Sequence, residues 1–143
     1  MTTRTLLPNS IPDGYNALLR LEKYIGTTSL DPIHKELIKI RASQINGCAF
    51  CINMHTTDAL QYGETAQRIF LLNAWRESDL FTDAERALLA LTEEVTLIQN
   101  HVSDETYANA AQHFDEKYLG EIIMMIITIN AWNRVAITTG LRA

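Results

Sequence analysis

The chain has 143 residues, of which 47% are hydrophobic and 20% are charged, and its formal net charge is −5. This length suits one ordinary domain with a buried core, and the composition excludes an intrinsically disordered chain. The acidic balance and the lack of adjacent Lys or Arg residues argue against a nucleic-acid-binding protein and against an anionic-membrane anchor. The longest apolar run is too short to cross a bilayer, and no signal-peptide core opens the chain. We therefore expect a cytoplasmic protein without nucleic-acid or membrane partners.

Helical patterns follow one another along the chain, whereas strand patterns are weak. Residues 1–12 are expected to form an N-terminal arm, and residues 13–143 a single helical domain. Three helices are expected to end at Gly26, Gly47 and Gly140, and Thr82 and Glu85 are expected to form a capping box at the start of another. The predicted helices span residues 13–25, 32–45, 48–62, 64–73, 82–98, 103–114 and 116–139.

The last predicted helix is apolar on nearly every side. Its apolar residues are Ile122, Ile123, Met124, Met125, Ile126, Ile127, Ile129, Trp132, Val135 and Ile137. Such a helix is either the centre of a monomer's core or a core helix that also lines a subunit interface. We favour the second interpretation, and predict an all-α, obligate homo-oligomer. The stretch Thr92-Glu93-Glu94 is expected to be a solvated helix face.

The only two cysteines, Cys48 and Cys51, stand in the sequence C-x-x-C-x-x-x-H, which ends at His55. A helix would place the two sulfurs and the imidazole on one face, because the spacings are three and four residues. Thiols so placed can close and reopen a disulfide, and the histidine can move a proton beside them. In a reducing cytosol this motif is more plausibly redox-active or metal-binding than a permanent crosslink. The start of a helix would favour the thiolate of Cys48.

Two further interpretations of this motif stay open. A zinc ion could be held by both thiols, one imidazole and one carboxylate, although the chain has no second cysteine pair. Glu36, on the preceding predicted helix, lies near an apolar stripe, where a carboxylate is paired, protonated or functional. It could orient His55 and share its proton, or it could simply pair with Lys39 or Arg41.

From Glu36 to His55 the pattern becomes E-x11-C-x-x-C-x-x-x-H, which resembles the alkylhydroperoxidase D (AhpD)-like group of the carboxymuconolactone decarboxylase superfamily. The resemblance extends from about Leu30 to Gly140. It includes the lead-in Leu37 to Cys48 and the elements Asn73-Ala-Trp-Arg-Glu-Ser, Glu85-Arg-Ala-Leu-Leu-Ala-Leu and Asn130-Ala-Trp-Asn-Arg134. It implies an all-helical fold that assembles as dimers, trimers or hexamers.

The resemblance also implies an activity and a set of roles. The activity is the reduction of hydroperoxides, with electrons from a dithiol partner such as a lipoyl domain or a thioredoxin-like protein. Glu36 and His55 would form a proton relay, Cys51 would attack the peroxide, and Cys48 would resolve the sulfenic acid to a disulfide. No cofactor and no metal ion are expected. The position directly before the second cysteine, a histidine in well-studied AhpD proteins, is Phe50 in this chain.

Two alternatives to the peroxidase hypothesis remain. Lactone decarboxylation is the chemistry that names the superfamily, but decarboxylases of that type generally lack the cysteine pair. A non-enzymatic redox sensor or scaffold would use the same thiols without turnover. The order in which the cysteines react also stays open: the start of the helix favours Cys48 as the more acidic thiol, whereas His55 could activate Cys51.

Overall fold

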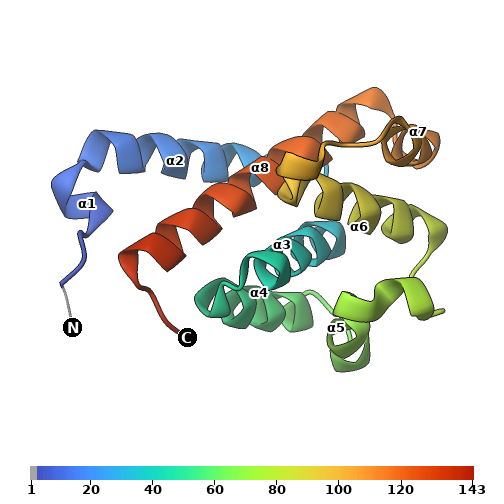
Figure 1. The fold of residues 1–143 in the computed structure, drawn as a ribbon, viewed down its shortest axis with the longest axis horizontal. Coiled ribbons are helices and arrows are strands. Elements are labelled where there is room, and N and C mark those ends of the chain that lie inside the picture. The colour runs from blue at the N-terminus through green and yellow to red at the C-terminus, as the bar shows by residue number, and fades with distance from the viewer. Residues whose placement is uncertain (1–2) are drawn as a thin grey trace.

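The computed structural model describes residues 3–143, and every regular element in that range is a helix (Figure 1). The first two residues of the expected arm lie outside the described residues. The elements are α1 (Leu7–Ser10), α2 (Pro12–Ile25), α3 (Pro32–Asn46), α4 (Ala49–Gln61), α5 (Ala66–Leu71), η1 (Leu72–Glu77), α6 (Asp83–Thr96), η2 (Ile98–Asn100), α7 (Asp104–His113) and α8 (Glu116–Thr139). The prediction of an all-α domain is confirmed.

The long helix α8 runs diagonally through the molecule and packs against α2, α3, α4, α6 and α7 (Figure 1). Fully buried apolar side chains of three helices meet there: Leu37, Ile38 and Ile40 of α3, Leu88, Leu89 and Leu91 of α6, and Ile122, Met125, Ile126 and Ile129 of α8. Burial of each contributes about 2 kcal/mol to stability. By length and composition alone α8 could span a membrane, but its place in this core accounts for its apolarity.

The helices α3 and α4 form an antiparallel hairpin whose turn is at Gly47. Asp31 caps the start of α3, where its Oδ1 accepts hydrogen bonds from the N–H groups of Ile33 at 2.7 Å and His34 at 3.4 Å. Gly47 ends α3 in the left-handed conformation, with φ at 70°, which suits a residue without a side chain. Cys48 then caps α4. The sharp reversal brings the first turn of α3 alongside the middle of α4.

The N-terminal segment lies along α8. Arg4 donates from Nη1 to the carbonyl oxygens of Ile137 at 3.0 Å and Thr138 at 2.9 Å, and so satisfies groups that the end of α8 leaves free. Trp132 of α8 donates from Nε1 to Glu22 of α2 at 2.9 Å. Arg4 thus holds the expected arm to the end of α8. The arm contains the short helix α1, which the sequence did not predict.

Two other predictions need correction. The fourth predicted helix begins at Ala66 and tightens at Leu72 into η1, because Ala74 has non-helical angles. Thr92-Glu93-Glu94 is not a solvated face, since Thr92 and Glu93 are buried. On α8, Ile127 and Ile137 are 45% and 44% exposed, so the apolar surface of this helix is not fully covered within one subunit.

Candidate functional site

The cysteine pair lies at the start of α4 and is closed as a disulfide. Cys48 is the N-cap residue and Cys51 belongs to the first turn, with 5.3 Å between their Cα atoms. The N–H of Cys51 donates to Sγ of Cys48 at 3.3 Å, so the backbone at the start of the helix contacts this sulfur directly. Both residues are buried. The helix start predicted at Cys48 is therefore confirmed to within one residue.

A polar network anchors this segment to α8. Asn46 donates from Nδ2 to the side-chain oxygens of Asn130 and Asn133, both at 2.9 Å. Asn133, fully buried, donates in turn to Oγ of Ser43 at 2.9 Å. Buried amides without partners destabilise a core, whereas a satisfied network fixes one arrangement. The Asn130–Arg134 element thus positions the turn that carries the cysteines, a role its sequence alone did not show.

Glu36 and His55 come together across the hairpin, as the sequence predicted. Oε2 of Glu36 lies 3.3 Å from Nδ1 of His55, and Oε1 of Glu36 accepts a hydrogen bond from Nζ of Lys39 at 2.9 Å. Glu36 is 2% exposed. Neither Oε2 nor Nδ1 has a well-formed hydrogen bond within the described chain. One carboxylate oxygen of Glu36 thus pairs with Lys39 and the other faces His55, so both expected contacts are present.

The charge of Glu36 is set by a balance of opposing effects. Burial alone would raise the pKa of Glu36, but the interactions with His55 and Lys39 outweigh it and hold this pKa below its usual value. Glu36 is therefore a carboxylate at neutral pH. Such a group stabilises a positive charge on the adjacent imidazole rather than storing a proton itself.

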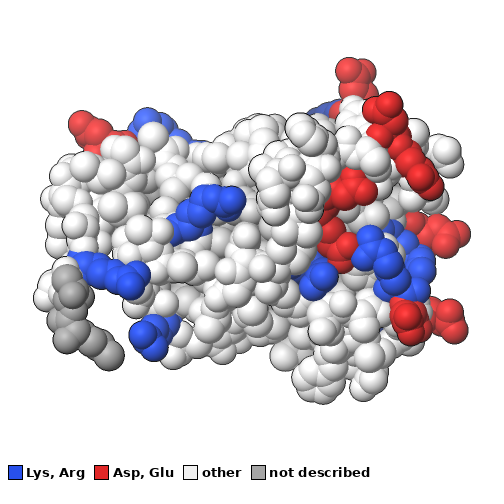
Figure 2. All heavy atoms as spheres, in the orientation of Figure 1, with Lys and Arg blue, Asp and Glu red and all other residues white. Residues whose placement is uncertain are grey.

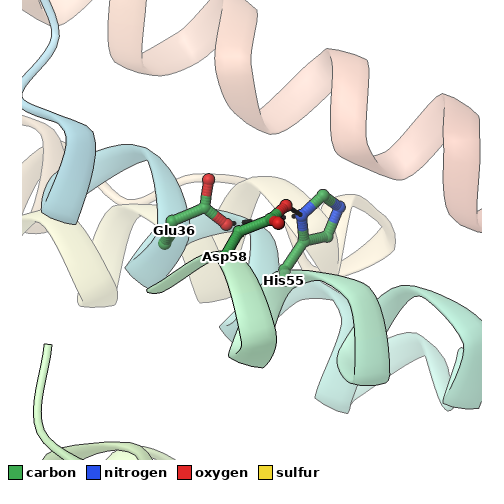
Figure 3. Close-up of side chains that lie close together, drawn as sticks. All are labelled: Glu36, His55 and Asp58. Carbon is green, nitrogen blue, oxygen red and sulfur yellow. Dashed lines mark ion pairs between the residues drawn. The ribbon is translucent and has the colours of Figure 1, made fainter. Parts of the chain in front are cut away.

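A third group at this point, Asp58, was missed in the sequence. Oδ2 of Asp58 lies 3.6 Å from the same Nδ1 of His55, one helical turn along α4. Figure 3 shows both carboxylates on the Nδ1 side of the ring, with Nε2 on the opposite side. Asp58 follows His55 by three residues, the spacing at which helical side chains meet, and this signal could have identified it.

The same three residues bear on metal binding. One ligand atom from each of Glu36, His55 and Asp58 lies within 4.8 Å of the others, so these oxygen and nitrogen donors are the ones that could hold a cation. In the disulfide state neither sulfur is a thiolate, and the zinc site that the sequence left open would require the reduced protein.

An apolar cavity of about 430 Å³ opens beside Cys51 and His55. Its walls are mainly apolar and aromatic, and come from the N-terminal segment, α4 and α8; they include Leu6, Leu7, Tyr15, Phe50, Met54, Met125, Ile129, Trp132 and Val135. Cys48 does not line this cavity. Phe50, at the position of the histidine in well-studied AhpD proteins, contributes an apolar ring to the wall.

The fold agrees with comparisons to known proteins. The carboxymuconolactone decarboxylase family matches residues 12–94, more than half of the chain. The chain therefore belongs to this family, and its fold is AhpD-like. The resemblance stated from the sequence is confirmed.

Individual relatives extend the match to the whole chain. The uncharacterized protein YdfG of Bacillus subtilis is 44% identical over 144 residues, covering 100% of this chain and 98% of its own. The crystal structure of ATU0492 from Agrobacterium tumefaciens, a protein of unknown function assigned provisionally to AhpD-type antioxidant defence, is 36% identical with a TM-score of 0.94, covering 99% and 97%. A variant of the debrominase Bmp8, in complex with 2,3,4-tribromopyrrole, shares the fold at 22% identity and a TM-score of 0.83, covering 92% and 71%.

Proposed function

We propose that this protein is a thiol-dependent hydroperoxide reductase in which Cys51 attacks the peroxide. The observation that carries the proposal is that Cys51 and His55 line one apolar cavity, with the ionised Glu36 buried behind the imidazole. A cavity with apolar walls suits the organic part of a hydroperoxide. Family membership and the cysteine pair support the same chemistry.

The arrangement of the ring nitrogens supports one proton path. Because Nδ1 of His55 faces two carboxylates, its hydrogen points toward them, and Nε2 is left to accept the proton of Cys51. Glu36 and Asp58 stabilise the imidazolium that results. The Cys51 thiolate then attacks the O–O bond, and the leaving alkoxide takes the proton back from Nε2. The products are an alcohol and a sulfenic acid on Cys51.

Cys48 completes the cycle. Its thiol displaces the sulfenic oxygen as water, which forms the Cys48–Cys51 disulfide seen in the structure. A dithiol then returns both cysteines to thiols, and is itself oxidised to a disulfide. This reductant, whether a lipoyl domain, a thioredoxin-like protein or a small dithiol, is part of the proposal. So is assembly into a homo-oligomer, which would cover the exposed Ile127 and Ile137 of α8.

The test is the removal of the attacking sulfur. We expect Cys51→Ser to abolish the consumption of cumene hydroperoxide in the presence of dihydrolipoamide, while Cys48→Ser still consumes one equivalent in a single turnover. Both variants should remain folded by circular dichroism. Equal steady-state consumption by Cys51→Ser and the unchanged protein would overturn the proposal, and turnover of a carboxymuconolactone by the double serine variant would establish decarboxylation instead.

Reductive debromination is a second candidate, favoured by the aromatic lining of the cavity, which includes Tyr15, Phe50 and Trp132. The Cys51 thiolate would take bromine from a carbon–bromine bond, and the carbanion would take the proton from His55. Cys48 would then displace bromide and form the same disulfide. Release of bromide from 2,3,4-tribromopyrrole with a dithiol present would support this candidate, and its absence would exclude that substrate.

A further inference from the structure

The two cysteines of the disulfide line different cavities. Cys51 lines the apolar cavity, whereas Cys48 lines a second, wider hollow of about 840 Å³, together with Arg4, Gly47, Ala49, Arg142 and neighbouring residues at the end of α8. Thr139 and Leu141 line both cavities and so form the wall between them. The two cysteines therefore face different cavities.

The charged side chains that line the second hollow are basic, although the chain as a whole is acidic. The chain has a net charge of −5, yet among residues 3–143 the only charged side chains that line the hollow are those of Arg4 and Arg142. Figure 2 shows the same contrast: acidic side chains gather at the α7 end, whereas the charged side chains near both chain ends on this face are basic. The start of α4, at Cys48, adds the positive end of a helix dipole.

Arg4 makes hydrogen bonds to other described residues, whereas Arg142 makes none. Arg4 is fixed by its hydrogen bonds to the carbonyl oxygens of Ile137 and Thr138, and it offsets the negative end of the α8 dipole beside the hollow. Arg142 is exposed and makes no hydrogen bond or ion pair with another described residue. Its guanidinium can therefore bind a carboxylate at the rim without first breaking a contact.

We propose that this hollow is the docking site of the reductant, and that it selects a small dithiol that carries a carboxylate. This inference rests on the proposed function, because it concerns the recycling of the same disulfide. The reductant's thiolate attacks Sγ of Cys48, the S–S bond breaks, and its electron pair goes to Sγ of Cys51. Cys51 lies beside His55 on the other side of the wall, and leaves as a thiolate that takes up the proton that the reductant's thiol released to solvent.

The second half of the exchange releases the product. The reductant's other thiolate attacks its own sulfur in the mixed disulfide, and displaces Cys48 as a thiolate. The dithiol leaves as a cyclic disulfide, oxidised by two electrons, and the protein gains both. Peroxide and reductant thus use separate entrances, and a peroxide bound in the apolar cavity does not block the exchange at Cys48.

A matched pair of reductants tests the role of charge. Dihydrolipoate and dihydrolipoamide have the same dithiol, and only the first carries a carboxylate. We expect dihydrolipoate to reduce the protein disulfide about fivefold faster at low ionic strength, and the ratio to approach one as salt screens the charges. The rate is measured by trapping free thiols with an alkylating reagent and counting them by mass spectrometry.

Two variants separate a local effect from the overall charge. Arg142→Gln should bring the two rates together without changing the rate with dihydrolipoamide, whereas Arg20→Gln, the same change on α2 away from the hollow, should leave the ratio intact. Equal rates in the unchanged protein, or a ratio that survives Arg142→Gln, would overturn the inference and leave the proposed function standing. If neither dithiol reduces the disulfide, the inference fails, and the reductant of the proposed function is a lipoyl domain or a thioredoxin-like protein instead.

The site of attack is tested separately with a monothiol. Mercaptoethanesulfonate, an anionic monothiol, has no second thiol to release itself, so at one equivalent with rapid alkylation it leaves a mixed disulfide on the sulfur that it attacks. We expect peptide mapping to find it on Cys48, with Cys51 alkylated. Predominant modification of Cys51 would show that the reductant enters through the apolar cavity, and would overturn the inference.

Discussion

Two buried glutamates on neighbouring core helices meet their surroundings in different ways. Glu93 of α6 accepts hydrogen bonds from Nε of Arg41 and Nε1 of Trp75, both at 2.8 Å, and from Nη1 of Arg76 at 2.5 Å. Glu36 of α3 has only Lys39 on one oxygen, and its other oxygen faces His55 without a well-formed hydrogen bond. A carboxylate whose two oxygens both accept hydrogen bonds fixes the packing of helices. A carboxylate with one oxygen left without a hydrogen bond beside a histidine is available for chemistry.

The largest expected difference between the two glutamates is in turnover. Glu36→Gln removes the charge that stabilises the imidazolium of His55, and should lower the rate of peroxide reduction by about a hundredfold. Glu93→Gln should leave the rate of the folded protein close to that of the unchanged chain. Steady-state peroxide consumption by the two variants, at equal folded concentration, measures this difference. Equal losses in both variants would show that Glu36 and Glu93 do not differ in their contribution to turnover.

Stability should show the reverse order. Glu93→Gln leaves two arginines without their shared carboxylate, and should lower the free energy of unfolding by about 2 kcal/mol. Glu36→Gln weakens one hydrogen bond from Lys39 and one contact with His55, and should cost less, about 1 kcal/mol. Urea unfolding followed by circular dichroism gives both values. A larger loss for Glu36→Gln would mean that Glu36 is mainly a structural residue.

The pH dependence of the free energy of unfolding tests the ionisation of these buried glutamates. Burial acts to raise the pKa of Glu93, but hydrogen bonds from Trp75, Arg76 and Arg41 lower it below its ordinary value of 4.5. Below about pH 4.5 the unfolded chain therefore binds a proton at this residue that the folded chain does not, so stability falls as the pH falls. Glu36 and Glu85 also have lowered pKa values and contribute with the same sign.

The variant that removes one of these groups tests the assignment. Because a glutamine does not titrate, Glu93→Gln should lose stability less steeply than the unchanged protein as the pH falls below about 4.5. Urea unfolding at a series of pH values measures the slope. An identical slope in the two proteins would show that Glu93 does not have a lowered pKa.

The smallest expected effect concerns Asp58. Its side chain is 39% exposed, so solvent screens its interaction with His55 more than it screens that of Glu36. Asp58→Asn should therefore lower peroxide turnover by about threefold. A loss as large as that of Glu36→Gln would make Asp58 an equal partner in the relay.

Much of this contrast was visible in the sequence, but not all of it. The C-x-x-C-x-x-x-H spacing predicted that Cys48, Cys51 and His55 would share one face of a helix, because local geometry decides those positions. The pairing of Glu36 with His55 was implied by the family resemblance. The burial of Glu93 was not predicted, since its partners Arg41 and Trp75 are brought to it only by tertiary packing. The same holds for the two separate cavities, whose walls combine both ends of the chain with α4 and α8.

The central claim is that Cys51 is the attacking sulfur and that the incompletely bonded Glu36 makes it reactive through His55. It is tested most directly by mixing reduced Cys48→Ser protein with cumene hydroperoxide and following sulfenic acid on Cys51 by rapid chemical trapping. We expect one equivalent of alcohol and one sulfenic acid. They should form about a hundredfold more slowly in the double variant Cys48→Ser with Glu36→Gln, and at an unchanged rate in the double variant Cys48→Ser with Glu93→Gln. No oxidation of Cys51, or equal rates in all three proteins, would contradict it.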